Sequence, residues 1–329
     1  MNKKNTKRNV QIDVLKGIAI LLVVIGHSIQ SSYLKFDENI IFRYIYSFHM
    51  ALFMFLSGYV QYGKTIDIKK KFLELAVPFL AWYQVFYLIK IVFYKSNENY
   101  FQYIYKLIIS PDWGLWFLWI LFLNLAYLKI VSQYVNKKAK FGDMVAFFSA
   151  WIVLNSVPLS IFGLGIMKDH FIYLATGYLF PKYSFIFKKI KKYFYPLVII
   201  LFIIFGFFWK RTSDPFGWNL ASVYFSKFGI PGEKILLQIY KLTTTYLGIA
   251  TIYILSPKKN GFIRTGLSYL GRKSFDIYVI HQSVLFGFNQ NFLKVTSKVI
   301  ISISMSLGLS KFLKQFSFLK IILFGKRKI

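Results

Sequence analysis

The sequence of 329 residues contains no cysteine, which excludes disulfide bonds, thiolate catalysis and zinc sites built on cysteine. Acidic residues are also scarce: 12 Asp and Glu residues stand against 42 Lys and Arg residues, for a formal net charge of +30. Neither an internal repeat nor a low-complexity linker divides the chain. We therefore expect one domain over residues 1–329, with a short basic segment at 1–11 and a basic tail at 314–329.

Hydrophobic residues make up 56% of the chain and aromatic residues 21%. A helix needs about 20 apolar residues to cross the hydrocarbon core of a membrane. About ten runs approach that length, at 12–30, 41–60, 73–94, 113–131, 143–157, 166–180, 194–209, 235–255, 274–289 and 296–313. They predict an all-α, polytopic integral membrane protein with about ten transmembrane helices, because a helix satisfies its own backbone groups in lipid.

The positive charge alternates between the two sides of this predicted arrangement. With the N-terminus inside, the outer segments contain 11 basic residues and the inner segments contain 25, at 3–8, 64–71, 129–140, 182–192, 258–273 and 326–328. The charges form no single patch, so they favour contact with anionic lipids over nucleic acid binding. We expect a multi-pass protein of the cell membrane with both termini in the cytoplasm. The abundance of lysine is typical of a bacterial gene with AT-rich coding.

The first apolar run begins like a signal peptide, but its length and its interruption by Asp13 and Lys16 favour an uncleaved helix. In "DVLKGIAILLVVIGHS", residues 13–28, Lys16 and His27 are separated by three helical turns plus about 20°. They therefore share one face, about 16 Å apart along the axis, and Asp13 falls within about 40° of it. The stretch predicts a polar stripe that runs from the cytoplasmic end toward the outer leaflet.

Three of the four histidines, His27, His49 and His281, lie within predicted spans, and His170 lies near an outer helix end. Ionisable groups inside a membrane indicate function by default, and histidine is suited to accept a proton near neutral pH. The alternative is that each histidine makes a structural hydrogen bond between helices. A zinc site built on three histidines lacks the usual H-x-x-x-H pair, so we expect no metal.

Ser57 and Gly58 follow in "FHMALFMFLSGY" and have the small size that lets helices approach closely. Packing is therefore the expected role of both residues. A nucleophilic Ser57 would need a neighbouring base.

Four stretches carry a resemblance to a known family: "DVLKGIAILLVVIGH", "FHMALFMFLSGY", "DWGLWFLWILF" and "YLGRKSFDIYVIH". They resemble, in order, landmarks of the membrane-bound acyltransferase-3 family. The likeness extends over roughly residues 8 to 290, and "FIYLATGYLF" resembles a further family segment more weakly. Within the family, the chain is most similar to the fucose-4-O-acetylase-like group of sugar O-acetyltransferases.

The resemblance implies an O-acyltransferase that moves an acyl group, here expected to be acetyl, from cytoplasmic acyl-CoA to a hydroxyl. The acceptor would be a sugar of a cell-surface or secreted glycan, and acyl-CoA would be a co-substrate rather than a permanently bound cofactor. Lys16 and His27 match the family's spacing of a basic residue, ten positions and a histidine; His49 and His281 match its other histidines. His27 would deprotonate the hydroxyl, while His281 or His49 would orient His27 or polarise the thioester carbonyl.

Lys16, Asp13 and Lys71 are the residues expected to bind or orient acyl-CoA. Asp13 has an alternative role, which is to neutralise Lys16. The chain departs from the family in "KKKFLELAVPF", where Lys71 fits a basic position but Glu74 stands where the family commonly has arginine. That departure puts a phosphate contact at this point in question.

Trp113, Trp116 and Trp119 are expected either to wall the cavity that holds the substrates or to pack among the helices. More generally, the aromatic residues form interfacial belts or stack on sugar faces. The rival function is a transporter or exporter of a lipid-linked or polymeric glycan, because polar stripes and membrane histidines also suit proton relays. Glycan-assembly proteins are the expected protein partners.

Overall fold

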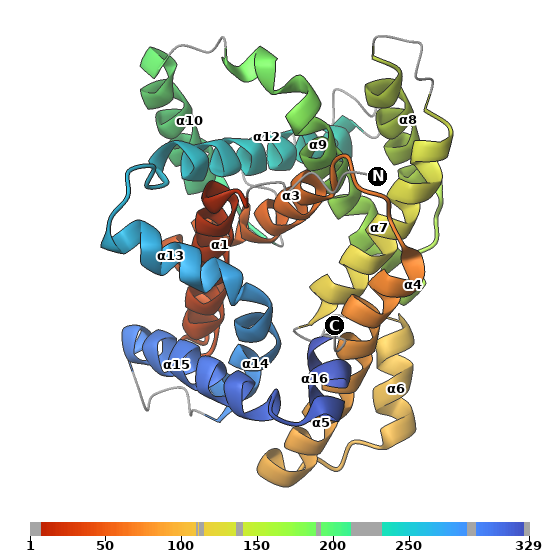
Figure 1. Cartoon of the computed structure of the whole chain (residues 1–329), viewed down its shortest axis with the longest axis vertical. Coiled ribbons are helices and arrows are strands. Elements are labelled where there is room, and N and C mark those ends of the chain that lie inside the picture. Colours follow the sequence, from red (N-terminus) through yellow and green to blue (C-terminus); the bar gives the residue numbers. More distant parts are fainter. Residues whose placement is uncertain are drawn as a thin grey trace.

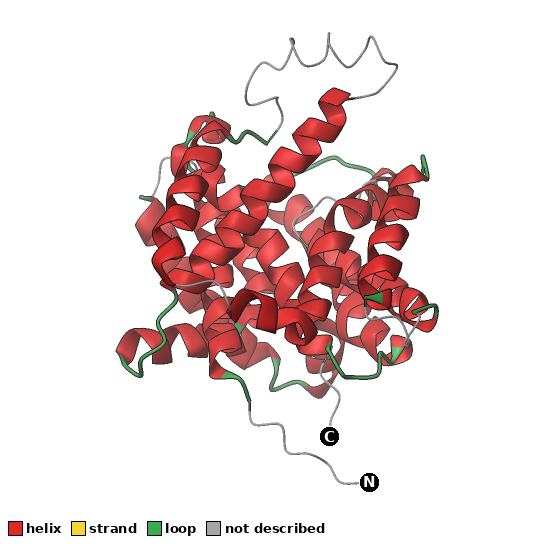
Figure 2. Ribbon diagram, turned by 90° about the horizontal axis from the view of Figure 1, so that it is seen from above, coloured by secondary structure: helices red, strands yellow, loops and turns green. Residues whose placement is uncertain are grey.

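The computed structural model describes residues 8–109, 111, 115–135, 141–188, 192–211, 232–287 and 294–325. All regular structure in these residues is helical (Figures 1 and 2), which confirms the predicted all-α class. The α-helices are α1 (Val10–Gln30), α2 (Ile40–Tyr46), α3 (His49–Gln61), α4 (Ile68–Lys71), α5 (Val77–Tyr94), α6 (Tyr100–Ile109), α7 (Trp116–Gln133), α8 (Gly142–Ser156), α9 (Leu164–Lys188), α10 (Tyr195–Phe208), α12 (Gly232–Leu255), α13 (Phe262–Arg272), α14 (Ser274–Phe286), α15 (Val295–Leu313) and α16 (Ser317–Phe324). Shorter turns are the 3₁₀ segments η1 (Phe36–Glu38), η3 (Ile161–Gly163) and η4 (Lys192–Phe194) and the π-helical η2 (Phe72–Ala76).

Four helical segments of the described residues are long and apolar enough to cross a membrane: Val10–Gln30, Ile40–Gln61, Ile68–Phe93 and Trp116–Gln133. Helices also lie at the other six predicted spans, as α8, α9, α10, α12, α14 and α15. Large apolar side chains are exposed on several of these helices, for example Ile203 and Phe207 on α10. Such exposure suits contact with lipid tails, while the number of ten spans stays a prediction.

The second predicted span, 41–60, is interrupted rather than continuous. α2 ends at Tyr46 and α3 begins at His49, and between them Phe48 has φ −149° and ψ −17°, outside the helical range. The hydroxyl of Thr245 on α12 donates to the carbonyl oxygen of Ser47 at 2.7 Å. This bond satisfies part of the irregular backbone, as buried positions at membrane depth require.

Glycine pairs set the closest helix contacts. A Cβ atom at Gly58 of α3 would lie 2.1 Å from the carbonyl oxygen of Leu174, and one at Gly177 of α9 would lie 2.0 Å from that of Phe55. α1 and α13 meet in the same way at Gly17 and Gly271. Only glycine allows such backbone contact. These contacts fix the position of α1 and α3, which carry two of the predicted site histidines.

The C-terminal segment packs back onto the helices that follow α4. The indole nitrogen of Trp82 on α5 donates to the carbonyl oxygen of Leu323 on α16 at 2.9 Å. Beyond α16, Gly325 adopts a left-handed φ of 62° and lies against the backbone of Glu74. The described part of the predicted basic tail, 314–325, is therefore mostly helical and packed; residues 326–329 lie outside the described residues.

Candidate active site

His27 and His281 lie side by side in the interior of the helical bundle. His27 stands one turn before the end of α1, and His281 lies in the middle of α14; their ring centres are 5.2 Å apart. His281 has no exposed surface, whereas His27 is half-buried. The His27 ring also lies 6.3 Å from the ring of Tyr46. Two predicted site histidines, far apart in sequence, are thus brought together.

His49 is placed beside this pair by the break between α2 and α3. It is the first residue of α3, it is buried, and its ring lies 4.7 Å from the ring of Tyr46. Tyr46 therefore stands between His27 and His49. The non-helical backbone of Phe48 separates α2 from α3 and so sets where His49 lies relative to Tyr46.

Each of the four histidines uses its Nδ1 atom in a hydrogen bond with an oxygen. His49 bonds the carbonyl oxygen of Ile45 at 2.8 Å, and His170 bonds that of Ile166 at 2.9 Å. His281 bonds the carbonyl oxygens of Tyr278 at 2.7 Å and Ile277 at 3.1 Å, while His27 meets the side-chain oxygen of Gln30 at 3.1 Å.

These oxygens only accept hydrogen bonds, so Nδ1 must carry the hydrogen in each neutral ring. The Nε2 atoms are then left as proton acceptors. Among the described residues, the buried Nε2 of His281 has no hydrogen-bond partner. His27 and His281 therefore form a pair of neighbouring bases, an arrangement suited to taking a proton from a hydroxyl.

Gln30 is the residue that orients His27. Its side-chain oxygen accepts hydrogen bonds from His27 Nδ1 and, at 3.2 Å, from the hydroxyl of Tyr46. One amide thus holds the imidazole in a single tautomer and ties it to α2. Sequence analysis did not find Gln30 or Tyr46; the available signal was that Gln30 lies one turn after His27.

Helix α15 packs against α14 and α1 with a buried polar face. The face is formed by residues four apart: Lys298, Ser302, Ser306 and Ser310. The hydroxyl of Ser302 donates to the carbonyl oxygen of His281 at 3.2 Å, and the amine of Lys298 donates to that of Ser31 at 3.0 Å. A cation is favoured at the C-terminal end of α1, where helix carbonyls lack partners.

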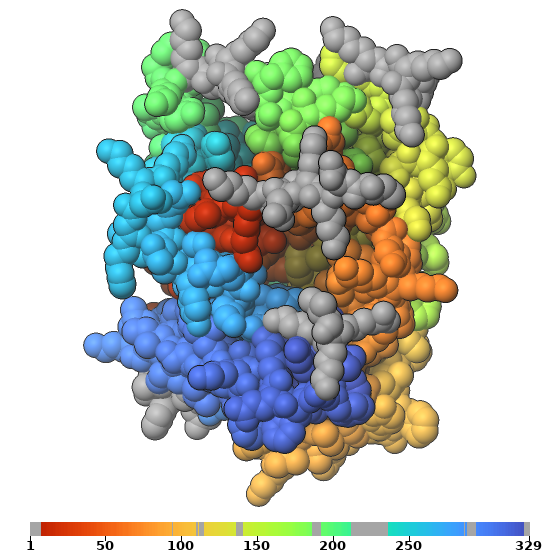
Figure 3. All heavy atoms as spheres, in the orientation of Figure 1, coloured from red at the N-terminus to blue at the C-terminus, as the bar shows by residue number. Residues whose placement is uncertain are grey.

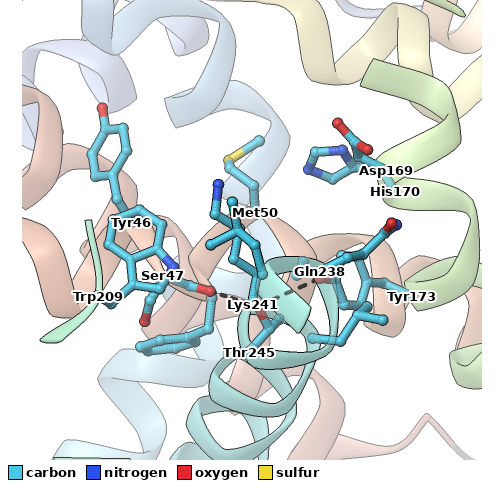
Figure 4. Close-up of a pocket in the computed structure, with 14 residues that line it drawn as sticks. Tyr46, Ser47, Met50, Asp169, His170, Tyr173, Trp209, Gln238, Lys241 and Thr245 are labelled. Carbon is cyan, nitrogen blue, oxygen red and sulfur yellow. Dashed lines mark hydrogen bonds between the residues drawn. The ribbon is translucent and has the colours of Figure 1, made fainter. Parts of the chain in front are cut away.

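A cavity of about 350 Å³ opens beside Tyr46 and His170 (Figure 4), and His27, His49 and His281 are not among the residues that line it. Its walls come from the break between α2 and α3, from α9, from α12 and from Trp209. Tyr46 lines it, and so does His170. The irregular backbone of the second span thus borders a cavity, which is the setting that membrane proteins tolerate for such backbone.

At the other end of α1, Asp13 is bound by Arg8 rather than by Lys16. The guanidinium donates two hydrogen bonds to the Asp13 carboxylate, at 2.6 and 3.1 Å. Lys16 is half-buried, makes no hydrogen bond or ion pair with another described residue, and lies within range of the charges of Lys64 and Lys71. Several cations therefore gather near the start of α1.

Glu74 has a local partner that explains its presence. Its carboxylate accepts a hydrogen bond from the Lys71 amine at 2.8 Å and lies 3.9 Å from the Lys70 amine. Glu74 lies within η2, and π-helical turns occur often at functional sites. Lys71 is thus partly neutralised, and its contact with acyl-CoA stays a prediction.

The predicted tryptophans occupy different surroundings. Trp116 lies with its ring centre 5.0 Å from that of His170, next to the cavity. Trp119 stacks on Phe79 and donates to the carbonyl oxygen of Phe162 at 2.8 Å, a packing role. Trp113 lies outside the described residues. The role of the three as a cavity wall stays a prediction.

Ser57 and metal binding were the other possibilities raised by the sequence. The Ser57 hydroxyl donates to the carbonyl oxygen of Phe53 in its own helix at 2.8 Å. Among the described residues, no group of three or more His, Cys, Asp or Glu side chains is placed to hold a metal ion.

The fold and the site together define a helical membrane protein with two neighbouring histidines in its interior. A family model described as an acyltransferase domain matches residues 9–313, nearly the whole chain. The protein therefore belongs to the acyltransferase-3 family, and the resemblance in its motifs is confirmed.

Two relatives share part of the sequence. The nodulation protein NolL of Mesorhizobium japonicum is 26% identical over 190 residues, which cover 53% of this chain and 48% of that protein. The nodulation protein NolL of Sinorhizobium fredii is 25% identical over 185 residues, with coverages of 53% and 49%. The matched region thus spans about half the length of these curated relatives. No solved structure is significantly similar to the chain.

Proposed function

We propose that the protein is an O-acyltransferase that moves an acetyl group from acyl-CoA to a hydroxyl of a sugar in a cell-surface or secreted glycan. The observation that carries the proposal is the pair of neighbouring bases, His27 and His281, together with a cavity of ligand size that Tyr46, a neighbour of His27, helps to line. Membership of the acyltransferase-3 family supports acyl transfer as the reaction.

The donor enters from the end of α1 that carries Lys16. Figure 3 shows the surface hollowed between α1, in red, and the orange segment around α4. The cations near that end attract the phosphates of CoA, and Lys16 is the one that shares a face of α1 with His27. The acyl-bearing arm then follows this face, about 16 Å along the helix, to the histidines.

The chemical step needs one proton acceptor and no metal. Nε2 of His27 takes the proton of the sugar hydroxyl, and the oxygen attacks the carbonyl carbon of the thioester. The carbon–sulfur bond breaks, and the leaving thiolate takes the same proton back from the His27 imidazolium. The products are a sugar ester and free CoA, so atoms and charge balance and the enzyme returns to its starting state.

His281 has a different part in this proposal. Its Nδ1 hydrogen is used by backbone carbonyls, so its neutral Nε2 accepts hydrogen bonds and does not donate to a thioester oxygen. We assign it to positioning the attacking hydroxyl. His49, held in the same tautomer beyond Tyr46, completes the polar surface on that side.

For the membrane arrangement, we propose ten spans in the cell membrane with both termini in the cytoplasm. The support is the alternation of basic segments along the sequence. Reporter fusions near residues 97 and 220 are expected outside, and fusions near 138 and 260 inside. An inside report at 220 would overturn the arrangement of the second half.

The test of function uses protein purified in detergent, without any gradient. With acetyl-CoA and soluble methyl glycosides, we expect release of CoA thiol and a sugar ester visible by mass spectrometry. His27→Gln should lose about 10²–10⁴-fold in turnover, the usual worth of a positioned general base. Flux of glycan across proteoliposomes without any acylation would instead support the transporter.

A further inference from the structure

The cavity beside Tyr46 contains polar side chains that the fold itself does not use. Asp169 of α9 and Gln238 and Lys241 of α12 line it, yet none of the three makes a hydrogen bond or ion pair with another described residue. Thr245, by contrast, is occupied, because it donates to Ser47 and lies 3.4 Å from the hydroxyl of Tyr173. As far as the described part of the chain is concerned, the first three side chains are therefore available to a ligand.

The remaining walls of the cavity are largely flat and apolar. Four aromatic residues are among those that line it: Tyr46, Phe48, Tyr173 and Trp209. Flat apolar rings beside planar or charged hydrogen-bonding groups suit a sugar, because a sugar has apolar C–H faces and a rim of hydroxyls. Figure 4 shows Asp169, Gln238 and Lys241 reaching into this space from α9 and α12.

The charges of the cavity select a neutral ligand. Asp169 and Lys241 are near enough to influence each other electrostatically, and their formal charges cancel. A site for a phosphate or a carboxylate would instead present an excess of cations. Donors from Lys241 and Gln238, and acceptors from Asp169 and Gln238, match hydroxyl groups, each of which both donates and accepts.

Tyr46 connects the cavity to the histidine pair. Tyr46 lines the cavity, and its hydroxyl bonds the Gln30 oxygen that also holds His27. The same ring lies 4.7 Å from His49 and 6.3 Å from His27. A sugar that contacts Tyr46 is therefore one side chain away from His27, the proposed proton acceptor.

We propose that this cavity is the acceptor subsite and binds one neutral, hydroxyl-rich sugar ring, stacked on its aromatic walls and hydrogen-bonded by Asp169, Gln238 and Lys241. The inference rests on the proposed function, because the reaction needs a place for the sugar. It adds the place where the sugar binds, the neutral charge of that sugar and the residues that select it.

Two measurements test the subsite separately from the chemistry. The first is quenching of tryptophan fluorescence by methyl α-glycosides of glucose, galactose, mannose and fucose without donor; the buried Trp209 reports binding, and Trp209→Phe should remove the signal. The second is the acceptor KM and the donor KM in acetyl transfer to the same glycosides.

Lys241→Met and Gln238→Leu should each weaken sugar binding and raise the acceptor KM about tenfold, the worth of one lost hydrogen bond, with the donor KM unchanged. Lys241→Arg, which keeps the charge and donors, should retain most of the affinity. Matched controls are Lys259→Met and Gln133→Leu, which change exposed residues that do not line the cavity. The yield of protein after size exclusion checks that each variant folds.

The possible failures are distinct. If the wild type acetylates glycosides while both cavity variants keep the wild-type acceptor KM, the subsite is wrong and the proposed function stands. If the wild type binds sugar in a Lys241-dependent manner but transfers no acyl group, the proposed function is wrong and the subsite stands. If the wild type neither binds sugar nor transfers an acyl group, both the subsite and the proposed function are wrong.

Discussion

Replacing Gln30 by methionine removes the oxygen that holds both the His27 imidazole and the Tyr46 hydroxyl. Methionine has nearly the same length and fills the space, but it offers no comparable acceptor. Two donors in the interior then lose a partner, and His27 becomes free to move its hydrogen from Nδ1 to Nε2. In that second tautomer, Nε2 no longer accepts the proton of a hydroxyl.

The size of the effect follows from the bonds lost. One neutral hydrogen bond contributes about 0.5–1.5 kcal/mol, and each factor of ten in rate corresponds to about 1.4 kcal/mol. Loss of both bonds to Gln30 should lower kcat by about 10- to 100-fold. Both KM values should stay near those of the wild type, because Gln30 touches neither substrate in the proposed arrangement.

Two further variants separate orientation from stability. Tyr46→Phe removes one donor and keeps the ring, so it should lower kcat only about threefold to tenfold. Gln30→Glu keeps an acceptor for Nδ1 and should retain more activity than Gln30→Met. A purely structural role predicts instead that both Gln30 variants lose detergent-stable protein in parallel with activity.

The assay measures CoA release under saturating donor and acceptor, with the folded yield determined by size exclusion. A well-folded Gln30→Met enzyme with kcat within twofold of the wild type would refute the assignment of Gln30. If His27→Gln is well folded and retains more than about a tenth of the wild-type turnover, the assignment of His27 as the base is wrong as well.

Three other changes test the remaining parts of the structure. Lys16→Ala should raise the donor KM with little change in kcat, because it removes binding common to the ground and transition states; an unchanged donor KM in the steady-state assay would contradict the donor path. Gly177→Ala should sharply reduce the yield of folded protein, because its methyl group would lie 2.0 Å from the Phe55 carbonyl oxygen, whereas Gly308→Ala, with open space around it, should not; equal yields would refute this contact. Glu98 bonds Lys106 and Lys90, which hold the pKa of its carboxyl below the ordinary value, so its stabilising effect is complete above about pH 4.3, the unfolded pKa, and is lost as pH falls through the folded pKa. Melting curves of Glu98→Gln should therefore differ from the wild type at pH 7 and approach it at low pH; a constant difference at all pH values would exclude the ion pairs as the cause.

The structure gives Glu74 a local role that the comparison with the family did not suggest. From sequence, it stood where the family commonly has arginine, which put a donor or phosphate contact at this point in question. In the fold, the carboxylate bonds Lys71 and lies near Lys70. Glu74 thus pairs with cations of α4. This pairing arises because Lys70 and Lys71 lie four and three residues before Glu74, and it does not require the residue that the family commonly has there.

Much of the fold was readable from sequence because lipid imposes simple rules on a chain. Runs of apolar residues form helices in lipid, and the described parts of all ten predicted runs contain helices, four of these segments being long and apolar enough to cross a membrane. The polar face of α1 followed from helical periodicity, which is local and needs no partner. The small residue Gly58 was likewise expected to pack, and it meets the backbone of α9.

The tertiary structure alone decided which of these groups meet. His281 reaches His27 only because α14 packs beside α1, and Gln30 gains its role only because Tyr46 of α2 bonds the same oxygen. The break at Ser47 could not be predicted, since Thr245, nearly two hundred residues away, completes its backbone hydrogen bonding. Sequence sets periodicity and length, which are properties of one helix. The structure also decided that Asp13 pairs with Arg8 and not with Lys16. Such a choice, like the shape of a cavity, depends on packing, and packing is a property of the whole chain.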